Sequence, residues 1–178
     1  MKNLHKRVEL LANLGILVIA ILLGITLVNR YLRPASPGPE ATQEMRVKPG
    51  TKLSLSGMDW QRSENTLLMV LSTTCHFCSE SSPFYQRLAQ ERGVGREVRL
   101  VAVLPQPPAE SEKYLAEHGI NVDEIRQSAP GAVYARATPT LILVDRTGSV
   151  IQSWVGKLPA EKEAEVISRF ARERSTGG

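Results

Sequence analysis

The chain has 178 residues, a formal net charge of +4 and a sequence pI of about 9.3. All of the excess positive charge lies in residues 1–50, which carry seven Lys or Arg and three Glu, whereas residues 51–178 carry fifteen basic and fifteen acidic side chains. A nucleic-acid-binding domain concentrates basic side chains on its folded part, so this distribution excludes nucleic acid as the expected partner.

Residues 10–28 form an apolar stretch without a charged side chain. As a helix it would be roughly 28 Å long, close to the ~30 Å hydrocarbon core of a bilayer. A buried core helix would keep a polar face, so we expect a transmembrane anchor over residues 10–29, preceded by a short segment of residues 1–9. The stretch is longer than the apolar part of a secretory signal peptide, and no A-x-A pattern follows it. We therefore expect the anchor to remain uncleaved.

The charges on either side of the apolar stretch indicate its orientation. Lys2, Lys6 and Arg7 precede it, and Arg30 and Arg33 follow it. The positive-inside rule favours a cytoplasmic N-terminus, which would place the rest of this single-pass protein on the extracytoplasmic side, periplasmic or outer. Residues 30–50 contain four prolines and are predicted to form an extended linker. Residues 51–178 are predicted to form one globular domain.

Strands and helices alternate along this domain. The runs 67–71 and 98–104 are continuously apolar, which is typical of strands buried on both faces. The turn sequence 145–148 predicts that the strands before and after it are antiparallel. The pattern predicts an α/β fold with strands at 53–56, 67–71, 98–104, 140–144 and 150–155, and helices at 76–91, 109–118 and 159–174.

The two cysteines of the chain, Cys75 and Cys78, are separated by two residues, where the strand 67–71 ends and a helix begins. A helix N-terminus carries partial positive charge and unpaired N–H groups, which stabilise a thiolate. Cys75 precedes the helix and is expected to attack a disulfide, and Cys78, one turn further, to resolve the mixed disulfide. His76 would add positive charge when protonated, and Phe77 would shape an apolar rim. This chemistry needs no cofactor beyond the dithiol.

Other readings of the cysteine pair are less favoured. A structural disulfide with so short a loop would constrain the unfolded chain little. A zinc site needs four ligands, commonly two C-x-x-C pairs, whereas this chain has one pair and three histidines. A copper-carrying C-x-x-C remains an alternative. We expect redox exchange.

A second motif, Thr138-Pro139, comes directly before the apolar strand 140–144. By itself it predicts an ordinary trans proline, because only about 5–6% of X-Pro bonds in folded proteins are cis. Together with the C-x-x-C pair, Pro83, the turn 145–148 and Gly156, however, it is similar to the thioredoxin superfamily over residues 51 to about 172. The resemblance implies a thioredoxin-like fold with a central mixed sheet flanked by helices. It also implies a cis Pro139 packed against the dithiol, as part of the catalytic site, with Thr138 as a substrate contact.

The combination of anchor, linker and one domain resembles the TlpA/ResA-like, redoxin-like membrane-anchored thiol-disulfide oxidoreductases of bacteria. The segment 105–119 resembles an insertion typical of that branch. The resemblance implies exchange with exported protein thiols or disulfides, more as a reductase than as an oxidase, together with an unidentified electron donor or acceptor. Alternatives on the same fold are a peroxiredoxin-like peroxidase and a non-enzymatic copper-handling or docking module.

The sequence departs from these families at several positions. Thr74 replaces the usual Trp before the first cysteine, and Met69 replaces the buried acid of thioredoxin. Ser81 stands where some ResA-like proteins have an acid, with Glu80 one position away. The peroxiredoxin pattern is matched at Ser72, but Leu68 occupies its proline position.

Overall fold

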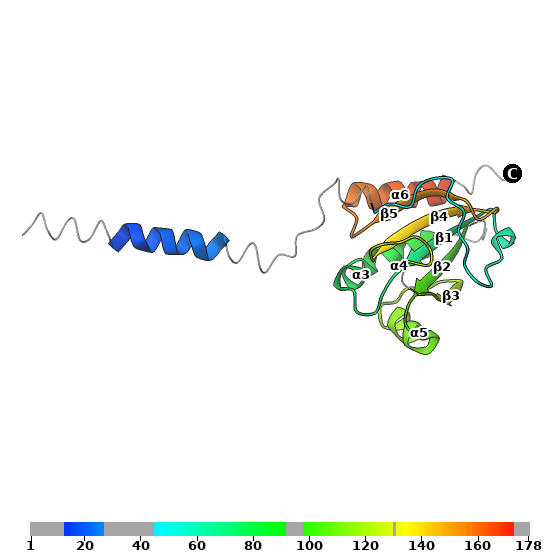
Figure 1. Ribbon diagram of the computed structural model, residues 1–178, viewed down its shortest axis with the longest axis horizontal. Coiled ribbons are helices and arrows are strands. Elements are labelled where there is room, and N and C mark those ends of the chain that lie inside the picture. Colours follow the sequence, from blue (N-terminus) through cyan, green and yellow to red (C-terminus); the bar gives the residue numbers. More distant parts are fainter. Residues whose placement is uncertain (1–12, 27–44, 92–97, 130, 173–178) are drawn as a thin grey trace, which may run out of the picture. The chain divides into compact units, whose positions relative to one another are not determined.

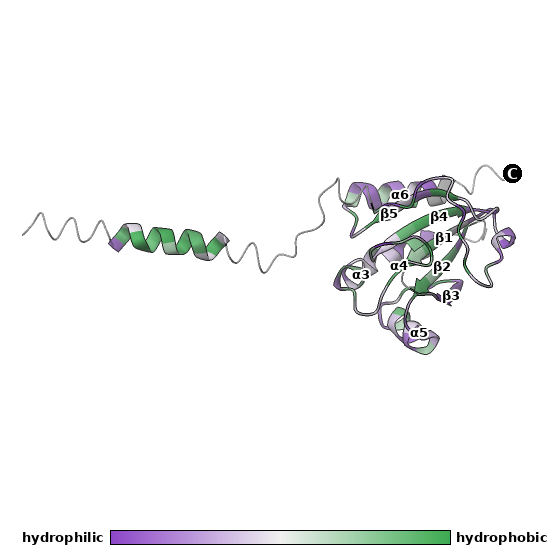
Figure 2. Ribbon diagram, viewed as in Figure 1, coloured by the Kyte–Doolittle hydropathy of each residue, from purple (hydrophilic) through white to green (hydrophobic). Residues whose placement is uncertain are grey.

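The computed structural model describes residues 13–26, 45–91, 98–129 and 131–172 (Figure 1). The chain divides into two compact units, Met1–Gly38 and Pro39–Gly178. In the first unit, residues 13–26 form a helix that is hydrophobic around most of its surface (Figure 2). No helix within the described ranges is both long and apolar enough to cross a membrane. Residues 10–12 and 27–29 of the predicted anchor, the segment 1–9 and residues 30–44 of the linker lie outside the described residues.

The second unit is built on a five-stranded sheet with the order β3-β2-β1-β4-β5. β1 pairs in parallel with β2, and β2 in parallel with β3, whereas β4 is antiparallel to both β1 and β5. The sheet is therefore mixed, as the resemblance implied. Its strands are β1 (Asn65–Val70), β2 (Val98–Leu104), β3 (Glu124–Gln127), β4 (Thr140–Asp145) and β5 (Val150–Val155).

Alternating side chains of the central strands feed two hydrophobic cores, one on each face of the sheet. Leu67 and Met69 of β1 point to the face covered by helices, where they join Phe84 and Leu88. Leu68 points to the other face, where it packs with residues of the segments 47–60 and 133–135. The helices are α3 (His76–Glu80), α4 (Ser82–Glu91), α5 (Pro108–Glu117) and α6 (Ala160–Arg172), and a short 3-10 helix, η1 (Trp60–Arg62), precedes β1.

The structure differs from the predicted elements at several places. The segment 53–56 is not a strand, because Leu53 and Leu55 are buried against the second core while only Lys52 forms a bridge, to Ser149. The edge strand β3 was not predicted, because its sequence EIRQ lacks an apolar run. The last helix begins one residue later than predicted and is described to Arg172.

The predicted helix 76–91 is divided into α3 and α4 at Ser81. Pro83 has no N–H to donate to the carbonyl four residues earlier, which belongs to Ser79. The Ser82 hydroxyl donates to that carbonyl instead, at 2.6 Å. The proline then occupies the first turn of α4, where its missing N–H is tolerated.

Candidate active site

The register of the sheet brings two distant segments together. Val70, the last residue of β1, lies opposite Val103 in the parallel strand β2 and opposite Thr140, the first residue of the antiparallel strand β4. The chain that leaves β1 therefore meets the chain that enters β4 at the same edge. This arrangement places the loop 71–75 beside Thr138 and Pro139.

Cys75 is half-buried and is the N-cap residue of α3. Its backbone is extended, with φ −88° and ψ 110°, as is usual for the residue before a helix. Its Sγ accepts a hydrogen bond from the N–H of Cys78 at 3.3 Å, and its thiol donates to the carbonyl oxygen of Thr138 at 3.3 Å. One sulfur thus contacts both motifs that the sequence singled out.

Cys78 lies one turn further and is fully buried in the core on the helical face. Both cysteines are free thiols. Burial raises the pKa of the Cys78 thiol well above its usual range, and a hydrogen bond with Cys75 adds to this effect. Cys75 is therefore the more accessible sulfur of the pair and Cys78 is held protonated, which agrees with the geometry expected of an attacking and a resolving thiol.

The Thr138–Pro139 peptide bond is cis, which confirms the expectation from the resemblance. Pro139 is buried, and its carbonyl accepts a hydrogen bond from the N–H of Gly156 at 2.8 Å. The Thr140 hydroxyl donates to the carbonyl of Ala137 at 2.7 Å. These contacts fasten the segment on both sides of Thr138, whose carbonyl faces the Cys75 thiol.

The two residues between the cysteines lie on the outer side of α3. The His76 side chain is 73% exposed, and its Nε2 lies 3.1 Å from Oε1 of Glu80. Lys157 pairs with the other carboxylate oxygen of Glu80 at 3.1 Å, and this contact is the main reason that the Glu80 pKa lies below its usual value. Phe77 is half-buried. Among the described contacts of His76, none is with a cysteine sulfur.

The departures from the family pattern leave the buried thiol without an acidic neighbour in the described part of the chain. Met69 is fully buried in the core. The Ser81 hydroxyl donates to the carbonyl of Phe77 at 2.8 Å. Two tyrosines, Tyr85 and Tyr114, belong to the same core as Cys78 instead, and burial raises the pKa of both.

Gln106 is a site residue that was not found from the sequence. Its Oε1 accepts the N–H of Thr73 at 3.4 Å, and its Nε2 donates to the hydroxyl of Ser72 at 3.1 Å. The Ser72 carbonyl in turn accepts the N–H of Cys75 at 3.1 Å. The available signal was position, because Gln106 follows β2, and the carboxyl ends of neighbouring parallel strands meet at one edge of the sheet.

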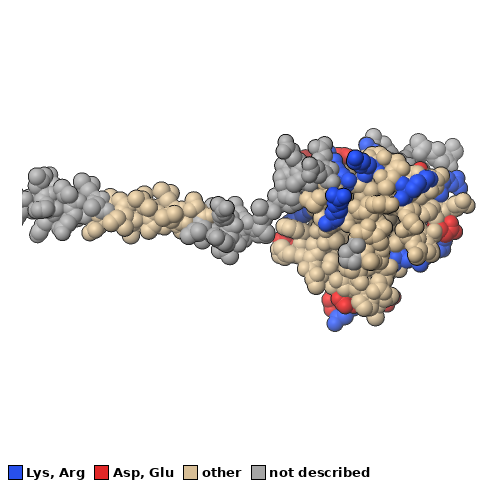
Figure 3. Space-filling view, in the orientation of Figure 1, with Lys and Arg blue, Asp and Glu red and all other residues tan. Residues whose placement is uncertain are grey.

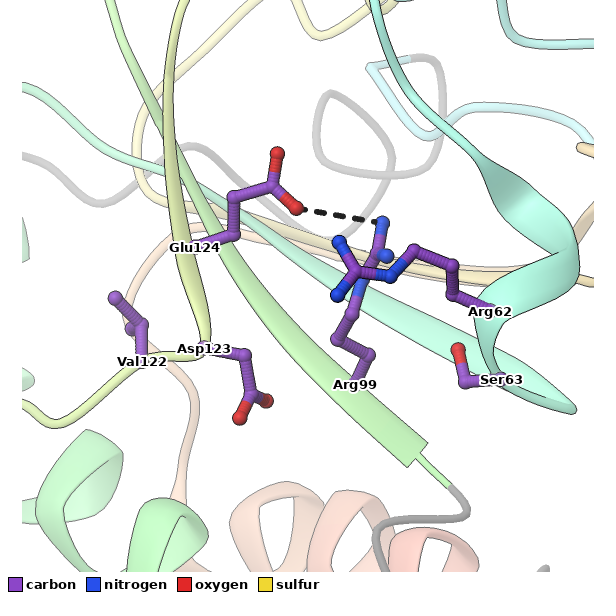
Figure 4. A pocket seen from close by; sticks show the side chains of 6 residues that line it. All are labelled: Arg62, Ser63, Arg99, Val122, Asp123 and Glu124. Carbon is purple, nitrogen blue, oxygen red and sulfur yellow. Dashed lines mark ion pairs between the residues drawn. The ribbon is translucent and has the colours of Figure 1, made fainter.

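A hollow of about 400 Å³ lies at the end of the strands opposite to the dithiol (Figure 4). The buried Arg99, near the start of β2, forms its floor and lies 3.7 Å from a carboxylate oxygen of Glu124. This hollow is separated from the dithiol by the length of β1 and β2. In the described ranges no three His, Cys, Asp or Glu side chains gather as a metal site would require.

Comparisons with known proteins agree on the fold. No family model and no curated protein matches the chain. Among solved structures, a protein assigned as the thiol:disulfide interchange protein DsbE of Chlorobium tepidum is 23% identical with a TM-score of 0.53, covering 71% of this chain and 96% of its own. A protein assigned as a disulfide isomerase of Bacteroides thetaiotaomicron is 14% identical with a TM-score of 0.59, covering 74% and 92%.

The thioredoxin domain of a thiol-disulfide oxidoreductase of Bacteroides vulgatus is 13% identical with a TM-score of 0.52, covering 70% of this chain and 99% of its own. At these identities the likeness establishes the architecture, and the architecture is the one that the motifs implied. The described residues between 45 and 172 therefore have the thioredoxin fold, with Cys75, Cys78 and the cis Pro139 gathered at one edge of its sheet.

Proposed function

We propose that the chain is a thiol-disulfide oxidoreductase that acts through Cys75 and Cys78. The observation that carries this proposal is the asymmetry of the two thiols. Cys75 is partly accessible and accepts an N–H from the first turn of α3, whereas Cys78 is fully buried behind it. The similarity to solved structures assigned as a thiol:disulfide interchange protein and as a thiol-disulfide oxidoreductase supports the proposal.

In the proposed reduction, Cys75 loses its proton and attacks one sulfur of a substrate disulfide. The substrate S–S bond breaks, a mixed disulfide with Cys75 forms, and the departing sulfur takes up a proton. Cys78 then loses its proton and attacks the Sγ of Cys75, which releases the second substrate sulfur as a thiol. The substrate gains two electrons and two protons, and the cysteine pair loses them.

The geometry favours this order of events. The N–H of Cys78 lies 3.3 Å from the Cys75 sulfur and stabilises negative charge on it. Cys78 begins as a protonated thiol, because burial raises its pKa. It is therefore unreactive until the mixed disulfide has formed next to it and a base has removed its proton.

We further propose that the domain is exported and tethered to the membrane. It would reduce disulfides of exported proteins, with electrons supplied to it by a separate donor. The basis is the uncharged stretch 10–28 with three basic side chains before it. Labelling of intact cells with a membrane-impermeant thiol reagent should reach Cys75 after reduction, in a strain whose outer barrier has been made permeable. Labelling only after lysis would show that the domain faces the cytoplasm.

A redox titration of the full chain, combined with an insulin-reduction assay, tests the activity. We expect insulin reduction that is lost in Cys75→Ser, and a potential nearer to the value of about −270 mV of thioredoxin than to the value of about −120 mV of DsbA. Rapid peroxide consumption without insulin reduction would favour a peroxidase. Stoichiometric Cu(I) binding without insulin reduction would favour the copper-handling alternative.

A further inference from the structure

The loop 131–137, which leads into the cis-proline segment, contributes to the lining of two hollows. The first, of about 270 Å³, is mostly apolar and lies where β1 and β2 end, with Val103 and Ala135 in its wall. Ser72 and Thr138 also line it, and each offers a backbone carbonyl to Cys75. A group bound in this apolar hollow would therefore lie directly next to the reactive sulfur.

The second hollow, of about 380 Å³, lies between the loop 131–137 and the segment 45–51. Three cationic side chains, Arg46, Lys48 and Arg136, line it, and we call it the basic hollow. Gly131 and Arg136 belong to both linings. The two hollows therefore share part of the loop 131–137, and the first of them reaches Ser72 and Thr138, whose carbonyls contact Cys75.

In the described part of the chain, acidic side chains do not balance the positive charge of the basic hollow. Arg46, Lys48 and Arg136 are exposed, and within the described part of the chain no Asp or Glu lines this hollow and none pairs with them. This contrasts with Arg87, Arg146 and Lys157, which all pair with glutamates. Figure 3 shows Lys and Arg side chains gathered over the upper part of the domain, with few Asp or Glu among them.

Tyr134 adds an aromatic surface to the basic hollow. It is 57% exposed and has φ 59°, the one positive φ of a non-glycine residue in the described ranges. A bulky residue in this conformation costs free energy, and such residues are concentrated at ligand-binding sites. The loop therefore holds a large ring at the surface, in the lining of the same hollow as the three cations.

We propose that the basic hollow binds an acidic segment of the substrate polypeptide whose disulfide is attacked by Cys75. This proposal rests on the proposed function. The segment would place an apolar side chain in the hollow lined by Val103 and Ala135, and carboxylates against Arg46, Lys48 and Arg136. Continuity with the reactive sulfur favours a polypeptide over an anionic membrane surface, which would match the charge but not the apolar path.

The experiment uses the reduced full chain in a nonionic detergent and three disulfide probes. Two are peptides with a leucine beside the disulfide cysteine, one flanked by aspartates and one by lysines at the same positions. The third is dipyridyl disulfide, which is small and uncharged. We expect the acidic peptide to react at least tenfold faster than the basic one, and the difference to shrink with added salt.

A triple variant, Arg46→Gln, Lys48→Gln and Arg136→Gln, should react about tenfold more slowly with the acidic peptide, equivalent to about 1.4 kcal/mol. Its rate with dipyridyl disulfide should not change. The matched control, Lys113→Gln, Arg146→Gln and Lys162→Gln, has the same change of net charge at distant exposed positions and should keep the wild-type preference.

The possible outcomes separate the two proposals. If wild type fails to reduce dipyridyl disulfide and both peptides, the proposed function itself is wrong. If it reduces all three but shows no preference between the peptides, only the acidic-substrate proposal is overturned. The acidic-substrate proposal is also overturned if the triple variant loses binding to anionic phosphatidylglycerol vesicles while its peptide rates are unchanged. The three cations would then bind a lipid surface.

Discussion

The Cys75 thiol donates a hydrogen bond to the carbonyl oxygen of Thr138 at 3.3 Å, across 63 positions of the sequence. That oxygen belongs to the residue before the buried Pro139, at the entrance to β4. A substrate sulfur that approaches Cys75 would therefore come close to the half-buried Thr138.

Cysteine variants should distinguish the roles of the two sulfurs. We expect Cys78→Ser to accumulate covalent mixed disulfides through Cys75, because the resolving thiol is gone. Cys75→Ser should accumulate few, because the remaining thiol is fully buried. Non-reducing gels of cells expressing each variant, followed by mass spectrometry, provide the measurement. Equal accumulation by both would show that Cys78 is reachable and that the assignment is wrong.

The stability of the reduced protein should fall in alkaline solution. The pKa of Cys78 is raised in the folded state. The contribution of this thiol to the free energy of unfolding is therefore fully present below the unfolded pKa of about 8.5 and is lost as pH rises further. Above pH of about 9 we expect a slope approaching −1.4 kcal/mol per pH unit from this group.

Urea unfolding at a series of pH values measures this slope. The control is reduced Cys78→Ala, which keeps Cys75 and the tyrosines with raised pKa values but lacks the buried thiol. Its stability should depend less steeply on pH between about 9 and 10. Identical slopes in the two proteins would mean that Cys78 ionises as easily in the folded chain as in the unfolded one.

Gln106 should position the loop before Cys75. Gln106→Ala removes hydrogen bonds to Thr73 and Ser72. Each of these two hydrogen bonds contributes about 0.5–1.5 kcal/mol, so we expect a loss of about 1–3 kcal/mol in the free energy of unfolding and a several-fold slower reaction with dipyridyl disulfide. Gln127→Ala, which removes a bond to the carbonyl of Pro105, is the matched control. A rate in Gln106→Ala equal to that of the control would limit Gln106 to a structural role.

Two glycines with the same backbone conformation should respond differently to alanine. Gly148 has φ 79° and Gly156 has φ 82°, so alanine at either costs about 1–2 kcal/mol in this left-handed region. A Cβ at Gly148 would also lie 3.0 Å from the Trp60 ring, whereas a Cβ at Gly156 would meet nothing within 4 Å. We expect Gly148→Ala to be the less stable variant by about 1–3 kcal/mol in urea unfolding. Equal losses would show that the indole moves aside.

The sequence was most informative where burial on both faces or a short motif constrained it. The apolar runs predicted β1 and β2 closely, and the turn 145–148 was correct, with Asp145 accepting the N–H of Thr147 at 2.8 Å. The spacing of Cys75 and Cys78 singled out two free cysteines that the structure places one turn apart, and the resemblance to thioredoxins supplied the cis Pro139. These features depend on local chemistry or on a pattern that recurs across the fold.

Features created by tertiary contacts were not predictable in this way. The strand β3 has half-exposed side chains and exists because β2 offers it a parallel edge. Gln106 and Arg136 acquire their places only when loops from different strands meet. The contact between Glu80 and Lys157 likewise joins residues 77 positions apart, so the surroundings of His76 could not be deduced from its neighbours in sequence.

The second core limits where a shortened form of the domain can begin. Val47 is 4% exposed, and its carbonyl accepts the buried Ser153 hydroxyl at 2.9 Å. A shortened protein that starts at Thr51 would open this side of the sheet and leave a hydroxyl in β5 without its acceptor. It would also lose Arg46 and Lys48, so a loss of substrate preference in that fragment would report missing side chains rather than a missing membrane. A useful soluble version must begin ahead of Met45.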